Sequence, residues 1–167
     1  MLINAIVLFW LVAMFIAGFL SGTMRQLWSL AVVAISTVVA GSLYLSFIGF
    51  TSRFVSNDNG AKVLSFIIVF FAISFVLGGP VAAIIGRTGS RPRYALGFDD
   101  ALGGGILGVI IAISLIEVAA VVIITYPVLG WSGWIKSSTL IQEFFIQFPI
   151  MMPLMPKEFQ QAFQLLR

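Results

Sequence analysis

Residues Val63–Gly86 read VLSFIIVFFAISFVLGGPVAAIIG, a stretch of 24 residues without a charged side chain. About 20 predominantly apolar residues are enough for a helix to cross a bilayer. Two further uncharged stretches, Met1–Met24 and Gln26–Ser52, have at least this length, and a fourth, Ala101–Ile135, is interrupted only by Glu117. The pattern predicts an all-α, polytopic membrane protein with four transmembrane helices.

The composition of the 167 residues excludes several classes of protein. Hydrophobic residues make up 60% and charged residues 9%, whereas a soluble domain has about 45–50% apolar and about 25% charged residues. The chain has no Cys and no His, which removes disulfides, thiolate nucleophiles and the commonest zinc ligand. Its net charge of +3 is spread over the loops and forms no basic stripe for nucleic acid. We expect no cofactor, no metal, no enzymatic activity and no nucleic-acid partner.

The expected helices and their connections form a single domain. The predicted transmembrane helices are residues 3–22, 26–49, 63–86 and 100–126. Only Thr23, Met24 and Arg25 separate the first two helices, so these should form an antiparallel hairpin. The connection Thr51–Lys62 is polar and contains the turn sequence Asn-Asp-Asn-Gly, so it should lie in water on the opposite side. In the third helix, Gly78-Gly79-Pro80 predicts a kink or a break.

The segment after the fourth helix, residues 127–167, has the pattern of short amphipathic helices. One predicted helix follows Ser137 or Ser138, either of which can cap it, and places these residues on one side: Leu140, Ile141, Phe144, Phe145 and Phe148. A second repeats the spacing with Phe159, Ala162, Phe163 and Leu166. Each is too short to span and should lie in the membrane interface or against the bundle, with partner binding as the alternative. The neighbouring Trp131 and Trp134 are typical of an aromatic belt.

Basic residues give the predicted orientation, because cytoplasmic loops are enriched in Lys and Arg. The first and third loops share one side and carry Arg25, Arg87, Arg91 and Arg93, whereas Arg53, Lys62 and Lys136 lie near the membrane on the other side. The dense cluster in the third loop places that loop in the cytoplasm and both termini outside it. Arg87, Arg91 and Arg93 are expected to contact anionic lipid headgroups.

Small residues recur at four-residue steps in two helices. Gly104, Gly108 and Ala112 form one row, and Gly18 and Gly22 form a shorter one. Such rows let membrane helices approach closely, so they predict packing within the bundle or in a homo-oligomer, with a pore-lining or hinge role as the alternative. The segment Gly103–Gly108 also fits the pattern of a dinucleotide-binding loop, but its flanks do not form the strand and helix that this loop requires.

Glu117 is an acidic residue inside a predicted span. It follows Asp100 by 17 residues, or about 25 Å of helix, which places it past the middle of the bilayer. A charge at such depth costs on the order of 2.5–3.5 kcal/mol. Two interpretations stay open: Glu117 is a proton or cation site facing the bundle interior, or it is a neutral acid that bonds to a helix hydroxyl such as Ser65 or Ser36, or that extends outward.

Two segments carry a resemblance to a known family. Gly18–Leu30, GFLSGTMRQLWSL, has a Gly-rich helix end that leads into an Arg and then a Ser-Leu pair. Asp100–Gly108, DALGGGILG, has an Asp followed by glycines at steps of four. A weaker match is Trp134–Leu140, where a Ser precedes an apolar residue. These features resemble the signatures of the colicin V production protein family (CvpA family).

The resemblance implies a bacterial inner-membrane protein of four helices, associated with colicin V production and with envelope physiology. Two positions depart from the family pattern. Asn4 stands where the first helix of the family often has an acidic residue, and Ile111, before Ala112, stands where a basic residue is common. Any role that the acidic and the basic residue have in the family is therefore not expected of Asn4 and Ile111.

Arg25 and Asp100 fall within the two resembling segments, at cytoplasmic helix ends in the predicted topology. We predict that they form a charged clasp between the first hairpin and the fourth helix. In the alternative, Arg25 only anchors the turn, while Asp100 caps its own helix at the positive end of the helix dipole.

Three functions stay open on sequence grounds. The favoured one is a non-enzymatic accessory protein that supports toxin production or export and envelope homeostasis through membrane lipids and partner proteins. The second is a small oligomeric transporter or channel that uses Glu117 and the break at Gly78-Gly79-Pro80. The third, an intramembrane enzyme, is the least favoured because the sequence offers no catalytic dyad or metal set.

Overall fold

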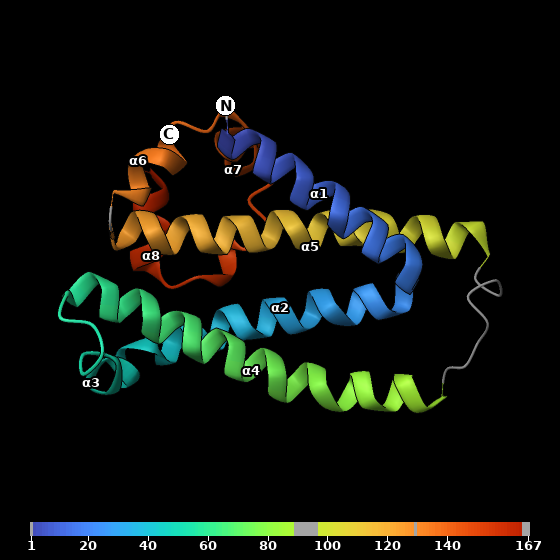
Figure 1. Ribbon diagram of the computed structural model, residues 1–167, viewed down its shortest axis with the longest axis horizontal. Helices are drawn as coiled ribbons and strands as arrows, with labels where there is room; N and C mark the ends of the chain where they lie inside the picture. The colour runs from blue at the N-terminus through green and yellow to red at the C-terminus, as the bar shows by residue number, and fades with distance from the viewer. Residues whose placement is uncertain (1, 89–96, 129, 165–167) are drawn as a thin grey trace.

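The computed structural model describes residues 2–88, 97–128 and 130–164, and every regular element within these ranges is a helix (Figure 1). The four long helices are α1 (Leu2–Ser21), α2 (Thr23–Leu43), α4 (Asp58–Thr88) and α5 (Phe98–Thr125). Two short elements, η1 (Tyr44–Phe47) and α3 (Ile48–Thr51), continue α2. Four helical stretches are long and apolar enough to cross a membrane, so the predicted fold class is confirmed.

The long helices do not pack in the order of the chain. α2 lies between α4 and α5, while α1 crosses α5 obliquely (Figure 1). α1 and α2 run in opposite directions, as predicted, but α1 packs mainly on α5 and hardly on α2. The link between them is also shorter than predicted: Gly22 alone joins the two helices, with a φ of 82° that favours glycine. The turn therefore directs α1 away from α2 and onto α5.

The start of α4 differs from the sequence-based expectation. The Asn-Asp-Asn-Gly sequence forms no turn; instead, α4 begins at Asp58, inside that sequence. The side chain of Asn57 explains the difference, because its Oδ1 accepts hydrogen bonds from the backbone N–H of Asn59 at 2.9 Å and of Gly60 at 3.4 Å. Asn57 thus satisfies free donors of the first helical turn. Lys62 and Asp58, four residues apart, form an ion pair on this turn.

α4 continues without a break through Gly78-Gly79-Pro80 to Thr88. Of the two predicted outcomes, the break is wrong, and the kink stays a prediction. Proline removes only one backbone donor from a helix, and transmembrane helices tolerate that loss. Nothing lies within 4 Å of the position that a Cβ would take at Gly78 or Gly79, so this part of α4 has open space beside it.

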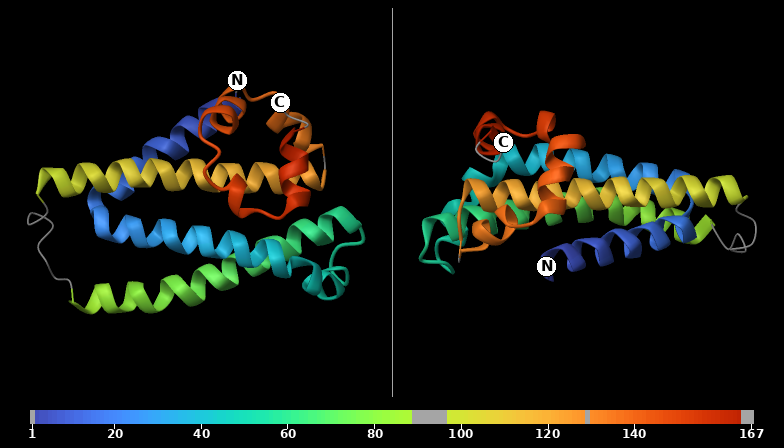
Figure 2. Two further views of the ribbon diagram at one scale, coloured as in Figure 1. Left: turned by 180° about the vertical axis from the view of Figure 1, so that it is seen from behind. Right: turned by 90° about the horizontal axis from the view of Figure 1, so that it is seen from above.

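The C-terminal segment folds against the bundle, which was one of the two expected placements. It contains α6 (Trp131–Lys136), α7 (Thr139–Gln147), η3 (Met152–Leu154) and α8 (Lys157–Gln164). The chain between α7 and α8 crosses α5, as seen from behind in Figure 2. Of the two predicted caps of α7, Ser138 is the one that accepts a bond, from the backbone N–H of Ile141 at 3.4 Å.

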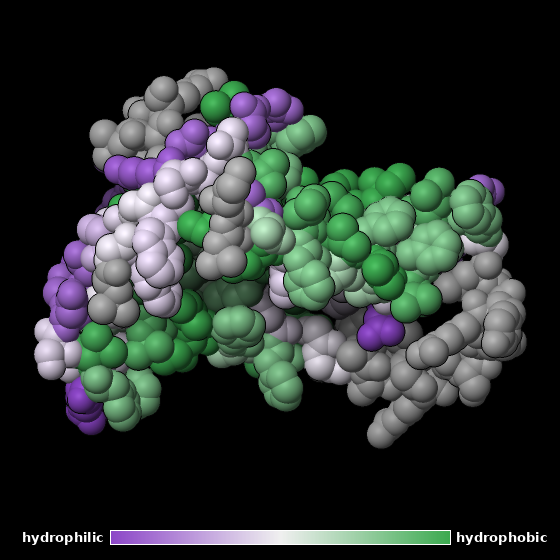
Figure 3. All heavy atoms as spheres, turned by 45° about the horizontal axis from the view of Figure 1, so that its top comes forward, coloured by the Kyte–Doolittle hydropathy of each residue, from purple (hydrophilic) through white to green (hydrophobic). Residues whose placement is uncertain are grey.

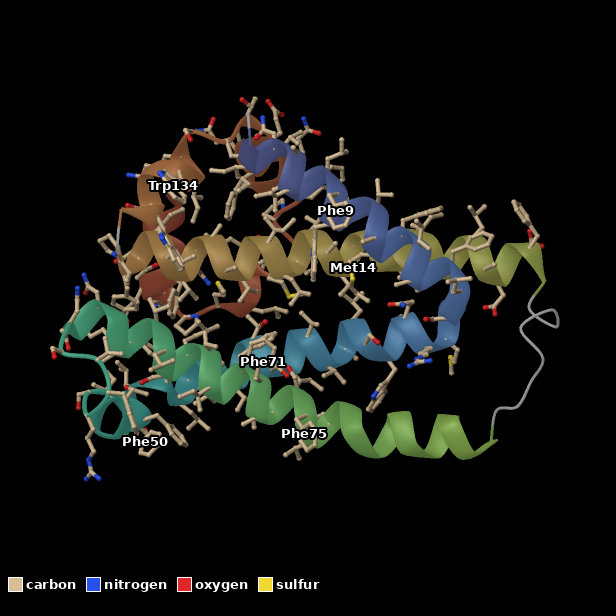
Figure 4. All side chains as sticks on the ribbon, in the orientation of Figure 1. Phe9, Met14, Phe50, Phe71, Phe75 and Trp134 are labelled. Atoms are coloured by element: carbon tan, nitrogen blue, oxygen red, sulfur yellow. The ribbon has the colours of Figure 1, made fainter. Side chains whose placement is uncertain are left out.

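Hydrophobic side chains are spread over much of the surface as well as the core. In Figure 3, hydrophilic side chains gather at the end of the molecule that holds the C-terminal helices, and most of the other coloured side chains on this face are hydrophobic. Phe75, which is 79% exposed, projects outward from α4 (Figure 4). An open groove of about 730 Å³ lies between α1 and α4, with α5 as its floor, and it is lined only by apolar residues. This distribution fits a molecule whose solvent is lipid.

Candidate functional site

The predicted rows of small residues lie where α1 crosses α5, close to Met14 (Figure 4). A Cβ at Gly18 would overlap the carbonyl oxygen of Gly104, and a Cβ at Gly108 would overlap the carbonyl oxygen of Met14. A Cβ at Gly104 would in turn overlap the carbonyl oxygen of Gly18 and would lie 2.8 Å from the carbonyl carbon of Gly22. The two backbones therefore touch directly, and no side chain longer than hydrogen fits between them.

Ala112, the last member of the α5 row, is fully buried one turn further along. Beside the row, a Cβ at Gly105 would lie 2.7 Å from the ring of Phe15. Glycines on two faces of α5 are thus in contact with α1. The rows join two helices of one chain.

The two segments that carry the family resemblance meet at the end of this contact. Asp100 accepts a hydrogen bond through Oδ1 from the backbone N–H of Thr23 at 3.0 Å. The Thr23 hydroxyl donates to the backbone carbonyl of Asp100 at 2.8 Å. The Asp100 carboxylate thus caps the first turn of α2, where free N–H groups and the positive end of the helix dipole favour an anion.

The predicted ion pair between Arg25 and Asp100 is not formed in the part of the chain that the structure describes. The reason is that α2 begins at Thr23 and not at Gln26. The first free backbone amide of α2 therefore faces Asp100, and the side chain of Arg25 is exposed. The alternative is met only in part. Asp100 lies in the first turn of α5, at the positive end of its own helix dipole, but its carboxylate accepts a bond from α2.

Most of the predicted basic loop lies outside the described residues. Arg91 and Arg93 lie outside the described residues, and Arg87 lies near the end of α4 with a side chain that is likewise outside them. Their expected contact with lipid headgroups stays a prediction.

Glu117 is buried, with 3% of its surface exposed, and its carboxylate faces the C-terminal segment. Oε2 accepts a hydrogen bond from the backbone N–H of Met151 at 2.9 Å, and Oε1 accepts one from Met152 at 3.3 Å. Neither hydroxyl considered as a partner bonds to it. The Ser65 hydroxyl is 2.7 Å from that of Thr51, and the Ser74 hydroxyl donates to that of Ser36 at 2.9 Å.

Glu117 therefore attaches the segment between α7 and α8 to α5. Sequence reasoning identified the residue but not its partners, because the partners are backbone groups of an irregular segment. The only signal available was the three prolines at 149, 153 and 156, which end regular helix and leave neighbouring amides free to bond elsewhere.

A second attachment, which sequence reasoning missed, holds α8 against η1 and the end of α5. The hydroxyl of Tyr44 lies 2.7 Å from that of Tyr126 and donates to Glu158 Oε2 at 3.0 Å. Next to Glu158, the ring of Phe159 is fully buried, with its centroid 5.5 Å from that of Tyr44. The amphipathic spacing indicated that Phe159 faces an apolar surface, but nothing in the spacing indicated which surface.

A third attachment joins the segment to α1. The hydroxyl of Ser138, which caps α7, donates to Asn4 Oδ1 at 2.7 Å. Asn4 is one of the two departures from the family pattern, and its side chain here bonds to a residue of the third resembling stretch. The C-terminal segment thus contacts α1 through Ser138, α5 through Glu117 and η1 through Glu158.

The described residues contain no group of three or more His, Cys, Asp and Glu side chains that could hold a metal ion. The buried side-chain oxygens and nitrogens of the same residues all have hydrogen-bond partners. The polar groups inside the bundle are therefore engaged with one another and with the backbone.

The model of the family described as colicin V production protein matches residues 3–148. The chain belongs to the colicin V production protein family. No curated protein and no solved structure is significantly similar to it. With the four apolar helices, membership of this family makes the chain a multi-pass membrane protein with a role of the colicin V production type.

The family match includes both glycine rows, the Thr23–Asp100 contact, Glu117 and the Tyr44–Tyr126 pair. It ends at Phe148, where the irregular segment bonded to Glu117 begins. Glu117, the acceptor of these two hydrogen bonds, is thus inside the matched region, and the donors Met151 and Met152 are outside it.

Proposed function

We propose that this protein is a non-enzymatic accessory protein of the bacterial inner membrane. It supports colicin V production or export and envelope homeostasis by binding partner proteins. The observation that carries the proposal is the family match over residues 3–148. The proposal extends the family's description to an activity through partners, to the inner membrane and to a role in the envelope.

The chemistry of the bundle supports a role through contacts. The groove between α1 and α4 has an apolar lining, whereas sites that orient a substrate use a few polar groups within an apolar pocket. Glu117, Ser36 and Ser65 bond to other parts of the chain. The exposed apolar faces of α1 and α4 are the surfaces that remain for lipid, for another membrane protein or for a second copy.

Site-specific photo-crosslinking in cells tests the partner proposal. A photoreactive residue replaces Phe9 or Phe75, which are 74% and 79% exposed on α1 and α4. We expect at least one of them to give a discrete adduct that contains another envelope protein. The matched control replaces Phe159, which is fully buried, and should capture only other parts of the same chain. Adducts with lipid alone at both exposed positions would contradict binding to a protein partner.

Deletion in the bacterium that carries this chain tests the biological role. Loss of the protein should lower the release of toxin and make the envelope more permeable, and the wild-type chain should restore both. Unchanged toxin release and permeability after deletion would contradict the proposed role.

Transport is the competing function, because an acidic residue lies within a spanning helix. Proton or ion flux in liposomes that is lost in Glu117→Gln but retained in Glu143→Gln would replace the present proposal. Glu143 is a suitable control because it is exposed and bonds only to Gln147 in α7. We expect no flux, since both oxygens of Glu117 already accept bonds from the backbone.

A further inference from the structure

The segment that Glu117 holds has an unusual composition. Phe148–Pro156, FPIMMPLMP, contains no charged or polar side chain over nine residues. It lies between α7, which ends at the polar residue Gln147, and α8, which begins at Lys157. Apart from the short η3 it is irregular. Irregular backbone is tolerated at membrane depth only where its polar groups are satisfied by the protein.

The backbone donors of this segment are all accounted for. Residues 149, 153 and 156 are prolines and have no N–H. Four of the remaining donors bond to carbonyl groups of the chain: Phe148 to Phe144, Ile150 to Phe148, Leu154 to Met151, and Met155 to Met152. The last two, Met151 and Met152, bond to Glu117. The segment therefore presents no free N–H to its surroundings.

Two estimates of depth along α5 place Glu117 inside the hydrocarbon layer. The charged residues Asp99 and Asp100 belong at one boundary of the layer, and Glu117 lies about 25 Å further along α5. Since the layer is about 30 Å thick, Glu117 lies about 5 Å inside the opposite boundary. Centring the 28-residue helix α5 in the same layer gives about 7 Å. The amides of Met151 and Met152 share this depth, because they bond to Glu117.

The side chains of the segment divide between protein and surroundings. Met151, Met152 and Met155 are buried in the hydrophobic core. Phe148, Pro149, Pro153 and Leu154 are exposed, with Phe148 at 51% and Leu154 at 41%. Each of these exposed side chains is apolar.

We propose that Phe148–Pro156 is a re-entrant segment, which enters the hydrocarbon layer after α7 and leaves it on the same side before α8. Its exposed side chains form a surface for lipid acyl chains. The prolines remove three backbone donors, and the buried carboxylate of Glu117 accepts from two more, so no N–H of the irregular backbone lacks a partner. In this arrangement Glu117 is a positioning residue that fixes the depth of the segment.

Single cysteines test the depth directly, because the chain has no Cys. Leu154→Cys is the informative variant, since Leu154 is exposed on the protein and only lipid can shield it. In liposomes, a water-soluble maleimide should react about tenfold or more slowly at Leu154→Cys than at Gln147→Cys, because hydrocarbon excludes the reagent. An environment-sensitive fluorophore at Leu154→Cys should emit at a shorter wavelength than at Gln147→Cys, shifted toward the emission of the reference Phe75→Cys on the spanning helix α4. A fast reaction and a water-like emission, equal to those of Gln147→Cys, would overturn the proposal.

A second comparison tests the role of Glu117. In the Leu154→Cys background, Glu117→Ala should raise the maleimide rate toward that of Gln147→Cys, because two amides lose their acceptor and the segment moves toward water. The control Glu143→Ala should leave the rate unchanged. An unchanged rate with a folded Glu117→Ala protein would overturn the positioning role. If Glu117→Ala does not fold, the measurements on Leu154→Cys with Glu117 intact still decide the depth.

Discussion

At the scale of single residues, the contact between α1 and α5 depends on the absence of a Cβ at Gly104. We predict that Gly104→Leu lowers the free energy of unfolding by about 1–3 kcal/mol or more, because the new side chain would force two touching backbones apart. Unfolding in mixed micelles measures the change. The control is Gly78→Leu in α4, where open space surrounds the Cβ position and removing a helical glycine gains up to about 1 kcal/mol. Equal effects at the two positions would contradict the prediction.

Asp100 provides a second prediction about a single residue. Asp100→Ala should lower the free energy of unfolding by about 0.5–2 kcal/mol, since the first turn of α2 loses its cap. Arg25→Ala should change it by less than about 0.5 kcal/mol, as for an exposed side chain without a structural role. The double variant should be additive within about 0.5 kcal/mol. Coupling above that limit in thermal unfolding would restore the clasp between Arg25 and Asp100.

Glu117 shows how far sequence reasoning reaches at this scale. Its depth followed from counting residues after Asp100, and burial in the structure agrees with a residue that faces the protein. Its partners did not follow, because backbone amides are present in every segment and carry no side-chain signal. The same limit applies to Thr23. Its backbone N–H donates to the carboxylate of Asp100, which was expected to pair with Arg25.

At the scale of elements, the attachment of α8 can be broken without removing a buried ring. Tyr44→Phe keeps the ring against Phe159 but deletes the hydroxyl that bonds to Glu158. We expect a loss of about 0.5–1.5 kcal/mol in the free energy of unfolding and faster proteolysis at α8. Glu158→Gln should give a smaller effect of the same sign, and Glu143→Gln should give none. If the two losses of unfolding free energy add fully in the double variant Tyr44→Phe, Glu158→Gln, the hydrogen bond between Tyr44 and Glu158 contributes nothing to stability.

The spans were predictable because charge is so costly in lipid that uncharged stretches identify them. The pairing of the helices was not predictable from the same information. The spacing of Gly104 and Gly108 defines a face of α5 but not the helix that meets it, and the short predicted link Thr23–Arg25 suggested α2 as the partner of α1. Among the residues that the structure describes, α1 and α5 have glycines on both sides of their contact, which lets the two backbones touch.

At the scale of the whole molecule, both chain ends are predicted to lie outside the cytoplasm. Ser56→Cys and Gln164→Cys should react with a membrane-impermeant thiol reagent in cells whose outer barrier has been opened, whereas Ser90→Cys should react only after lysis. The physical reason is the basic loop that contains Arg87, Arg91 and Arg93, which favours the cytoplasmic side. The parent chain without Cys is the control for background labelling. The reverse labelling pattern would refute the orientation.

The crossing of α1 over α5 also has a consequence for how the protein is made. Membrane proteins are synthesised from the N-terminus, so α1 leaves the ribosome long before its partner does. Gly18 and Gly104, which touch in the finished protein, are separated by 86 positions. Throughout the synthesis of α2 and α4, the glycine face of α1 has only lipid or an insertion factor beside it. A ribosome that stalls before Phe98 would therefore leave the glycine face of α1 without the helix on which it packs.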